Sequence, residues 1–466
     1  MRSRLALLPL LPLVMVTLGL SPAGRTLDLW TVYQLALHND PQYQQVLATA
    51  KASEEARPQA LAALLPQVSL AASLTQVNTD STRVSSFSIP GNKFAYFTGL
   101  SASNTPTRAY TAQLTETLFN WADWQSLHEA DLTGAEALAT LNASIQSILL
   151  TVSQDYFNVL YAEDLLGAQR ATEKAFASQL ALAEEQYKVG LQPVTAAEQA
   201  RASYDQAAAQ VIADKLSLTT AKEALEALIG VPVVRLRPLV HQLPLARPAP
   251  DNLNHWINQA VAQNPTLIAA RLAAEAGHAN VSVQRAQAYP SLDLVLSHGR
   301  SFTTGTSSQA SPTASLSAPA VSGTNTNVLG LDLSWPIYSG GLIASRARQA
   351  RYEYEADLAQ SATTERTTVS GTRTDFLSVI SEMAQVRALK QSVRSSRIAL
   401  RATEAGYKVG TQTMVDVLTA RQTLLTAEES YALSRYNYLI AVLTLDQDAG
   451  TLTPAVIQSI NHFLLH

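Results

Sequence analysis

The chain repeats itself, and this duplication limits its possible folds more than any other feature of the sequence. The run Tyr187-Lys188-Val189-Gly190 recurs 220 positions later as Tyr407-Lys408-Val409-Gly410. Further residues recur at the same offset or at an offset of 224, and these pairs are Ala200 and Ala420, Arg201 and Arg421, Gly230 and Gly450, Pro41 and Pro265, and Pro66 and Pro290. Self-similarity at a fixed period is typical of duplicated supersecondary structure. We therefore expect a unit of about 220 residues that is present twice.

The two repeats leave segments at both ends of the chain and one between them. Arg2 and Arg4 precede an apolar run (residues 5–20) and the small residues Ser21-Pro22-Ala23, which is the layout of a secretory signal peptide. An uncleaved anchor helix is the alternative. Five prolines between residues 231 and 252 exclude a helix and predict an extended linker. The expected organisation is a signal peptide (1–23), a first repeat (24–230), a Pro-rich linker (231–252), a second repeat (253–450) and a C-terminal tail (451–466).

Each repeat contains two segments in which apolar and polar residues alternate. This period of two predicts strands at 66–78, 108–120, 290–302 and 326–338. Each is close to the 9–11 residues of a tilted membrane strand. Four strands cannot close a transmembrane barrel, because the smallest barrels use about eight. We therefore expect several copies to pool their strands in a homo-oligomer.

The segments inside the two strand pairs, at 79–106 and 302–326, are rich in Ser, Thr and Gly. We expect them to be long outward loops, with a disordered insertion as the alternative. After residue 23, no run approaches the ~18 consecutive apolar residues of a spanning helix. A membrane location would therefore require a closed β-barrel.

The remainder of each repeat predicts helices. Segments 28–65 and 253–289 should be helical, with breaks near Pro41 and Pro265. Long helices are expected at 121–188 and 341–408, and each would be about 100 Å long at 1.5 Å per residue. Returning helices at 195–229 and 415–449 carry an apolar stripe every seven residues, which is typical of coiled coils. An ordinary soluble helical hairpin explains the stripe equally well but does not explain the strands.

Composition excludes several functions. With 33 Lys and Arg against 37 Asp and Glu, the chain lacks the basic excess of a nucleic-acid-binding protein. It has no cysteine, so it can form neither a disulfide nor a lipid-modified N-terminal cysteine. The eight histidines are scattered, and no phosphate loop or nucleophile elbow is present. We expect neither an enzyme nor a cofactor or metal.

The turns that join the long and returning helices hold the most informative residues. Gly190 and Pro193 break the first helix, and Gly410 breaks the second, shortly before Asp416. An acidic residue repeated by symmetry at a narrow opening would form a charge ring that favours cations. The alternative is an exposed aspartate that interacts with the dipole at a helix start.

The second turn and its surroundings resemble a known family. The run Glu404-Ala405-Gly406-Tyr407-Lys408-Val409-Gly410-Thr411, with Val415-Asp416-Val417-Leu418 and Arg435-Tyr436-Asn437-Tyr438-Leu439, is similar to the TolC family of outer-membrane efflux channels. Val189-Gly190-Leu191 resembles the family's first-repeat tip. The segment from Trp335 to Gly341, which includes Pro336 and Gly340, resembles its strand-to-helix corner. The similarity covers essentially the whole mature chain.

This resemblance implies a mainly α-helical fold with a small β part. Three copies would form a 12-stranded outer-membrane β-barrel and a long periplasmic α-barrel. The implied function is passive export of drugs, toxic compounds or secreted proteins. The implied partners are a periplasmic adaptor (membrane fusion) protein, an inner-membrane pump of ABC or RND type, and outer-membrane lipid. Neither the substrate nor the pump class follows from the sequence.

The resemblance also assigns residues to two sites. Tyr407 would belong to the periplasmic gate, but the family's acidic and arginine partners are replaced by Ala196 and Gln412, and Thr419 replaces a second acid, which leaves Asp416 alone. We therefore expect a less tightly latched aperture. The adaptor-docking tips are expected at Tyr187, Val189, Gly190, Leu191, Val409, Gly410 and Thr411. A soluble periplasmic coiled-coil scaffold or adaptor is the alternative function, and a periplasmic hydrolase is a third that lacks a catalytic cluster.

Overall fold

The structure is a computed structural model that describes residues 26–91, 93–240, 243–311 and 314–465. The signal peptide predicted at 1–23 lies outside these residues. The chain forms two compact units, and each draws on both repeats. The first comprises residues up to 44, 146–256 and 373 onward, and the second comprises 45–145 and 257–372.

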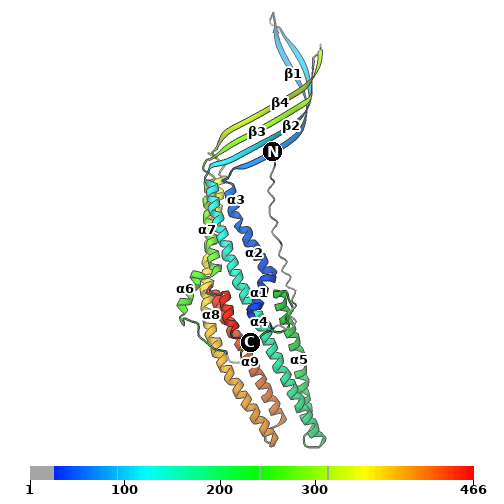
Figure 1. Cartoon of the computed structure of the whole chain (residues 1–466), viewed down its shortest axis with the longest axis vertical. Coiled ribbons are helices and arrows are strands. Elements are labelled where there is room, and N and C mark those ends of the chain that lie inside the picture. Colours follow the sequence, from blue (N-terminus) through cyan, green and yellow to red (C-terminus); the bar gives the residue numbers. More distant parts are fainter. Residues whose placement is uncertain (1–25, 92, 241–242, 312–313, 466) are drawn as a thin grey trace, which may run out of the picture. The chain divides into compact units, whose positions relative to one another are not determined.

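The second unit contains an antiparallel four-stranded sheet in the order β1-β2-β3-β4 (Figure 1). The strands are β1 (Gln67–Ile89), β2 (Lys93–Asn120), β3 (Ser291–Ser311) and β4 (Ala314–Ser334). They are 21 to 28 residues long, about twice the predicted length. Among the residues that the structure describes, the sheet is open, because β1 and β4 each pair on one side only.

The loops predicted at 79–106 and 302–326 are wrong, because most of these residues are strand. β1 and β2 pair without interruption from Gln67 opposite Thr115 to Ile89 opposite Lys93. β3 and β4 pair likewise from Ser291 to Ser311. Threonine favours strands, and continuous pairing satisfies the backbone of the Ser-rich and Gly-rich segments. The alternative of a disordered insertion is therefore also wrong.

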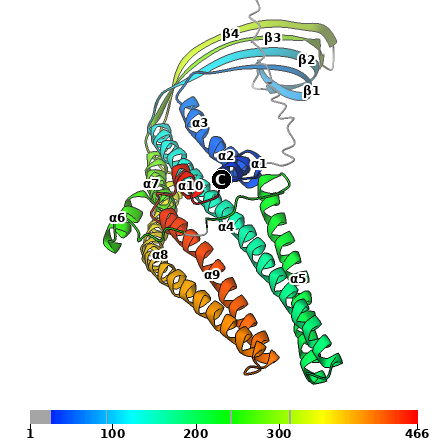
Figure 2. The same cartoon turned by 60° about the horizontal axis from the view of Figure 1, so that its bottom comes forward.

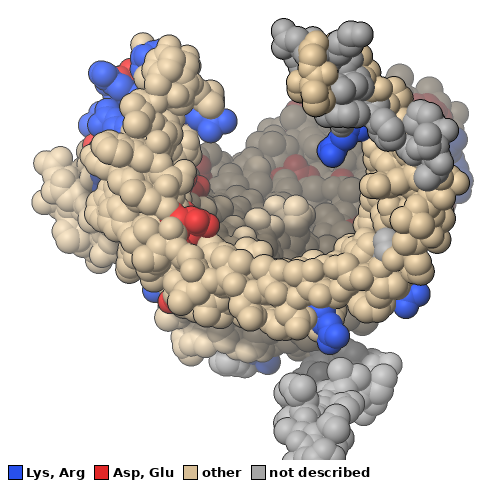
Figure 3. Space-filling view, turned by 90° about the horizontal axis from the view of Figure 1, so that it is seen from above, with Lys and Arg blue, Asp and Glu red and all other residues tan. Residues whose placement is uncertain are grey.

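The predicted alternation gives the sheet one apolar face and one polar face. Val68, Leu114, Leu296 and Leu329 form one row across the four strands. The adjacent row on the other face consists of Ser69, Gln113, Ser297 and Val328. Val68 and Leu329 are 76% and 77% exposed, so the described residues leave these positions of the apolar face uncovered. Figure 3, which looks down on the sheet, shows a curved surface with few charged side chains.

The predicted long helices are present and agree with the predicted bounds to within one residue. They are α4 (Trp121–Lys188), α5 (Val194–Ile229), α8 (Leu342–Lys408) and α9 (Met414–Asp448), and Figure 2 shows the α4–α5 and α8–α9 hairpins. Among the described helices, one meets the length and composition expected of a membrane span, in an 18-residue window of α4. The sequence predicts no such helix beyond residue 23, and this single window is weak evidence for one.

The shorter helices flank the strands and the linker. The segment predicted as one broken helix at 28–65 consists of α1 (Leu29–Asn39), α2 (Pro41–Glu54) and α3 (Ala56–Ala62). Its counterpart consists of α6 (Leu253–Gln263) and α7 (Pro265–Ala286), and the tail contains α10 (Pro454–Asn461). New helices begin at the expected Pro41 and Pro265, where the missing N–H is tolerated in the first turn of a helix. A further break at Glu55, between α2 and α3, was not predicted.

Aromatic residues join the helices within the first unit. Tyr156 of α4 is fully buried, and its hydroxyl donates to the carbonyl oxygens of Arg237 (2.9 Å) and Leu27 (3.3 Å). The ring of Phe157 packs 6.0 Å from that of Tyr436 on α9. The Tyr436 hydroxyl donates to Asp164 of α4 at 2.7 Å. These contacts fasten α4 to the linker and to α9.

Two carboxyl groups meet between α8 and the end of α9. Asp375 and Asp448 are joined by a side-chain hydrogen bond, which requires that the pair hold a proton. Burial, together with the Asp375 carboxyl, raises the pKa of Asp448 to about 7. Burial also raises the pKa of Asp375.

This pair predicts that stability falls as the pH rises toward neutrality. The folded-state pKa of Asp448 lies above its ordinary value of 3.8, so between about pH 4 and pH 7 the folded chain holds a proton that the unfolded chain has lost. Binding of this proton stabilises the folded chain, and the stabilisation is lost as the pH rises through 7. Asp448→Asn should raise the thermal midpoint at pH 8 by about 2–4 °C, which corresponds to about 1 kcal/mol for this partly buried group. Thermal unfolding of the variant at pH 5 and pH 8 should show a smaller difference than the native chain. Asp205→Asn, at an exposed position, is the control, and an equal effect in both variants would contradict the assignment.

Candidate functional site

The two helix turns have the same backbone geometry. In the first, Leu191 N–H donates to the Gln186 carbonyl at 2.8 Å, and in the second Thr411 N–H donates to the Gly406 carbonyl at 2.9 Å. Gly190 and Gly410 have φ angles of 75° and 78°, a left-handed conformation that glycine adopts without steric cost. These are Schellman motifs at the ends of α4 and α8. The duplication seen in the sequence thus extends to the hydrogen bonds of the turns.

The predicted docking tips are exposed at both turns. Tyr187 and Val189 in the first turn and Val409 in the second are 49%, 67% and 75% exposed. Leu191 is 74% exposed. Gly190, Gly410 and Thr411 are also exposed. Apolar side chains grouped on a surface in this way are typical of protein-binding sites.

The helix that follows the second turn begins with a capping box. Asp416 Oδ2 accepts from the Thr413 N–H at 2.7 Å, and the Asp416 N–H donates to Thr413 Oγ1 at 3.2 Å. Hydrogen bonds from Thr413 hold the pKa of Asp416 below its ordinary value, so this exposed side chain is an anion at neutral pH. α5 has no equivalent, because its N-cap is Pro193. The helix-start interpretation of Asp416 is therefore correct, and its exposed charge is also available at the turn.

Tyr407 connects the two hairpins. Its hydroxyl donates to Gln186 Oε1 of α4 at 2.8 Å. Its ring packs against a buried cluster from three helices, which includes Phe176, Ala197 and Met414. Burial raises the pKa of Tyr407 above 10, so its hydroxyl stays protonated and able to donate. Gln186 is a partner that the sequence did not predict.

The other predicted gate residues do not gather around Tyr407. Ala196 is buried at 9% exposure on α5, next to the cluster that holds Ala197. Gln412 is exposed and packs over Gly406, where an added Cβ would lie 2.7 Å from Gln412 Cγ. Thr419 is exposed on α9. Within the described residues, the contact between the hairpins at this level is the hydrogen bond of Tyr407 and the cluster under it.

An ion pair supports each turn from the same position in the repeat. Arg201 of α5 contacts Glu184 of α4 at 2.8 Å, and Arg421 of α9 contacts Glu404 of α8 at 2.5 Å. Both members are displaced by 220 residues between the repeats. Each pair holds the returning helix against the long helix in the same register.

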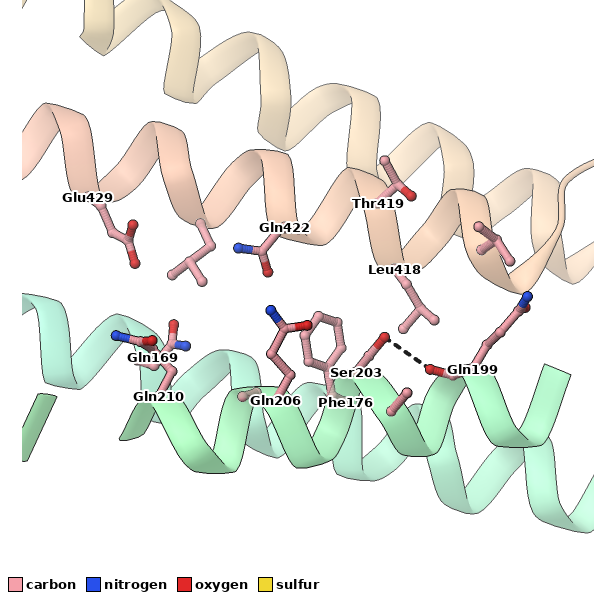
Figure 4. Close-up of a pocket in the computed structure, with 14 residues that line it drawn as sticks. Gln169, Phe176, Gln199, Ser203, Gln206, Gln210, Leu418, Thr419, Gln422 and Glu429 are labelled. Carbon is pink, nitrogen blue, oxygen red and sulfur yellow. Dashed lines mark hydrogen bonds between the residues drawn. The ribbon is translucent and has the colours of Figure 1, made fainter. Parts of the chain in front are cut away.

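A polar groove of about 670 Å³ lies between the hairpins. Half of its lining side chains are amides or hydroxyls (Figure 4), namely Gln169 of α4, Gln199, Ser203, Gln206 and Gln210 of α5, and Thr419 and Gln422 of α9. Glu429 of α9 adds one carboxyl group. Phe176 and Leu418 supply apolar surface. Burial, and then the charge of Asp214, raise the pKa of Glu429. The groove can therefore accept a polar helix face without a strong charge requirement.

The strand-to-helix corner belongs to the second unit. Pro336 follows β4, and Gly340 and Gly341 have φ angles of 64° and 87° just before α8. Trp335 and Tyr338 are 62% and 88% exposed. In the first repeat β2 continues directly into α4, and the Asn120 side chain accepts from the Ala122 N–H at 3.0 Å. The two corners therefore differ although the repeats are equivalent.

The described residues contain no group of three or more His, Cys, Asp or Glu side chains that could hold a metal ion. The arrangement at the turns combines exposed apolar tips, the anionic side chain of Asp416 and a polar groove. Such a surface can bind another protein and can narrow an opening.

Comparison with known proteins identifies the family of this chain. The family model described as "Outer membrane efflux protein" matches residues 32–231 and 256–451, one match for each repeat. The chain is 31% identical to outer membrane protein TolC of Vibrio cholerae over 97% of its length and 98% of that protein. It is 30% identical to TolC of Escherichia coli, over 96% of this chain and 87% of the other. The alkaline protease secretion protein AprF of Pseudomonas aeruginosa is 26% identical, over 91% and 84%.

A solved structure confirms the fold. The outer membrane protein VceC from Vibrio cholerae superimposes with a TM-score of 0.70 over 91% of this chain and 96% of the other, at 20% identity.

Proposed function

Because this chain belongs to the outer membrane efflux protein family, we propose that three copies form a passive channel across the outer membrane. Family members such as TolC are channels rather than enzymes, and outer membrane is their location. The family also makes a soluble periplasmic scaffold or a hydrolase untenable. For this chain, we propose both that three copies assemble and that they enclose one continuous pore.

The open edges of the sheet are the main support for the proposed trimer. β1 and β4 are edge strands of 23 and 21 residues, and each leaves backbone donors and acceptors without partners along one side. An edge of this length pairs with another strand or aggregates. If β4 of one copy pairs with β1 of the next, three copies close twelve strands, and no backbone group faces lipid unpaired. The exposed apolar face then contacts lipid, and the polar face lines the pore.

The family and the relatives support two classes of substrate. The family name refers to efflux, which fits drugs and toxic compounds. AprF is a protease secretion protein, which fits secreted proteins. We propose that the channel exports one of these classes after an inner-membrane pump of ABC or RND type has delivered it.

We propose that a periplasmic adaptor protein docks at the two turns and in the groove between the hairpins. The exposed side chains of Val189, Leu191 and Val409 provide apolar anchors. The amide-rich groove provides hydrogen-bonding partners for a helix of the adaptor. The matching geometry of the two turns would offer one adaptor two similar sites on each subunit.

We propose that Tyr407 and Gln186 form the latch of the periplasmic aperture and that Asp416 supplies its acidic ring. Gln412 has an uncharged amide and Ala196 has only a methyl group, so neither can add the salt-linked latch of the wider family. One neutral hydrogen bond per subunit contributes about 0.5–1.5 kcal/mol. The aperture should therefore close only weakly.

Planar-bilayer recordings test both the channel and its latch. The native protein should insert as discrete conducting steps. Tyr407→Phe removes the hydrogen bond but keeps the ring, and it should raise the open population by about 2–10-fold per subunit. Tyr204→Phe is the matched control, because Tyr204 packs against the same cluster.

Absence of conducting steps would contradict the channel. An unchanged open population in Tyr407→Phe would contradict only the latch.

A further inference from the structure

The apolar face of the sheet contains one strongly charged patch. Arg108 of β2 pairs with Phe302 of β3, and Tyr110 of β2 pairs with Arg300 of β3. Two arginines and two aromatic residues thus alternate in a block of four on one face. Arginines at diagonal positions of neighbouring strands are about 7–8 Å apart at the backbone, close enough for both guanidinium groups to reach one anion.

The block of four borders a shallow depression of about 680 Å³. Ala72 and Leu74 of β1 form its other side, opposite Tyr110 and Arg108. Both arginines are exposed. The Phe302 ring lies over Gly323 of β4, where an added Cβ would be 3.4 Å from the ring. The depression is therefore built from three strands, with apolar walls and two cationic groups.

Neither arginine has a counter-ion in the part of the chain that the structure describes. The carboxylates on the same face are Glu116 and Asp80, each at least six residues along the strands from the nearer arginine. Six residues correspond to about 20 Å. The pair is thus a local excess of two positive charges on the face that contacts lipid in our proposed function.

The position of the block along the strands determines how deep it would lie in the membrane. Arg300 pairs with Asn325, which is ten residues before Trp335 at the strand-to-helix corner. Ten strand residues span about 33 Å, or about 25 Å along the membrane normal at a tilt of about 40°. That is the height of the apolar band of a membrane barrel, so Trp335 and the block lie at its two boundaries.

The leucines between these boundaries agree with this placement. Leu329, Leu331 and Leu333 follow one another on the apolar face of β4, and Leu292, Leu294 and Leu296 do so on β3. Because the strands continue into helices at the corner, that boundary faces the periplasm. The arginines therefore lie at the outer boundary, where aromatic rings are also favoured.

We propose that Arg108 and Arg300 bind the phosphate group of a lipid in the outer leaflet, with Tyr110 and Phe302 against the apolar part of its headgroup region. An arginine buried in hydrocarbon costs about 2–4 kcal/mol, but this cost falls to about 0–1 kcal/mol at the interface. Guanidinium groups bind phosphate oxygens through paired hydrogen bonds. The site rests on the proposed function, because it requires the apolar face to contact the membrane.

The test measures binding of diphosphoryl lipid A to purified, delipidated trimers by native mass spectrometry. Arg108→Gln combined with Arg300→Gln should weaken binding about 30-fold, from about 1 kcal/mol per arginine. Dephosphorylated lipid A should bind the native protein as weakly as the variant binds the phosphorylated form. Arg83→Gln removes a positive charge from the polar face of β1 and should bind lipid A like the native protein.

Equal binding by the double variant and the native protein, with both trimeric, would overturn the lipid site and leave the channel unaffected. Displacement of lipid A by millimolar inorganic phosphate would show a site for free phosphate and would also overturn it. Failure of the native protein to form trimers that insert in membranes would overturn the proposed function, and the lipid site with it.

Discussion

Replacing Leu331 with arginine is expected to keep the protein out of the outer membrane. Leu331 is 63% exposed and lies between Leu329 and Leu333 on the apolar face of β4, near the middle of the proposed apolar band between Asn325 and Trp335. An arginine at the middle of the bilayer costs about 2–4 kcal/mol, and a trimer carries three copies, so the penalty per channel is about 6–12 kcal/mol. Membrane flotation followed by trimer detection should show the variant almost entirely outside the membrane fraction.

Val328→Arg is the matched control for this experiment. Val328 is on the same strand but belongs to the polar row with Ser69, Gln113 and Ser297. A positive charge there would face the pore, where water solvates it, so the variant should insert and assemble normally. Equal exclusion of both variants would show that the sheet does not have one lipid face and one pore face.

The helices could be predicted closely because their signals are local. The proline-free stretches ending at Lys188 and Lys408 allow no earlier break, and glycine follows each two residues later. The repeat then doubles the support for every boundary. The capping box of Asp416 also had a local signal, since Thr413 precedes an acidic residue by three positions.

The strands beyond the apolar band could not be predicted, because their order comes from pairing rather than from alternation. Asp80 lies opposite Ala102 in an unbroken ladder, yet neither neighbourhood shows an apolar period. The partner of Tyr407 is similarly non-local. Gln186 is 221 residues away and carries no motif, so only the packing of the two hairpins brings these residues together. The groove glutamines could have been noticed, since Gln199 and Gln206 are seven residues apart on one helix face.

Gly410→Pro is expected to abolish adaptor docking and export while leaving the pore intact. Gly410 has a φ of 78°, and its N–H donates to the Tyr407 carbonyl at 3.1 Å. Proline fixes φ near −65° and has no N–H, so the turn must rearrange at a cost of about 3 kcal/mol or more. Val409 and Thr411 would then leave their positions at the tip. Site-specific crosslinking to the adaptor and cellular export should each fall by at least about tenfold.

Gly410→Asn separates the geometry of the turn from the identity of the residue. Asparagine tolerates the left-handed conformation, so this variant should retain most of the crosslinking and export. Both variants should still form trimers and conduct in planar bilayers, because the sheet belongs to the other compact unit. Gly190→Pro extends the comparison to the first repeat, whose turn has the same hydrogen bonds. Loss of crosslinking in both proline variants would mean that the adaptor reads both turns, and loss in one alone would mean that the duplicated geometry serves docking only once. Normal crosslinking in both would exclude the turns from the docking site.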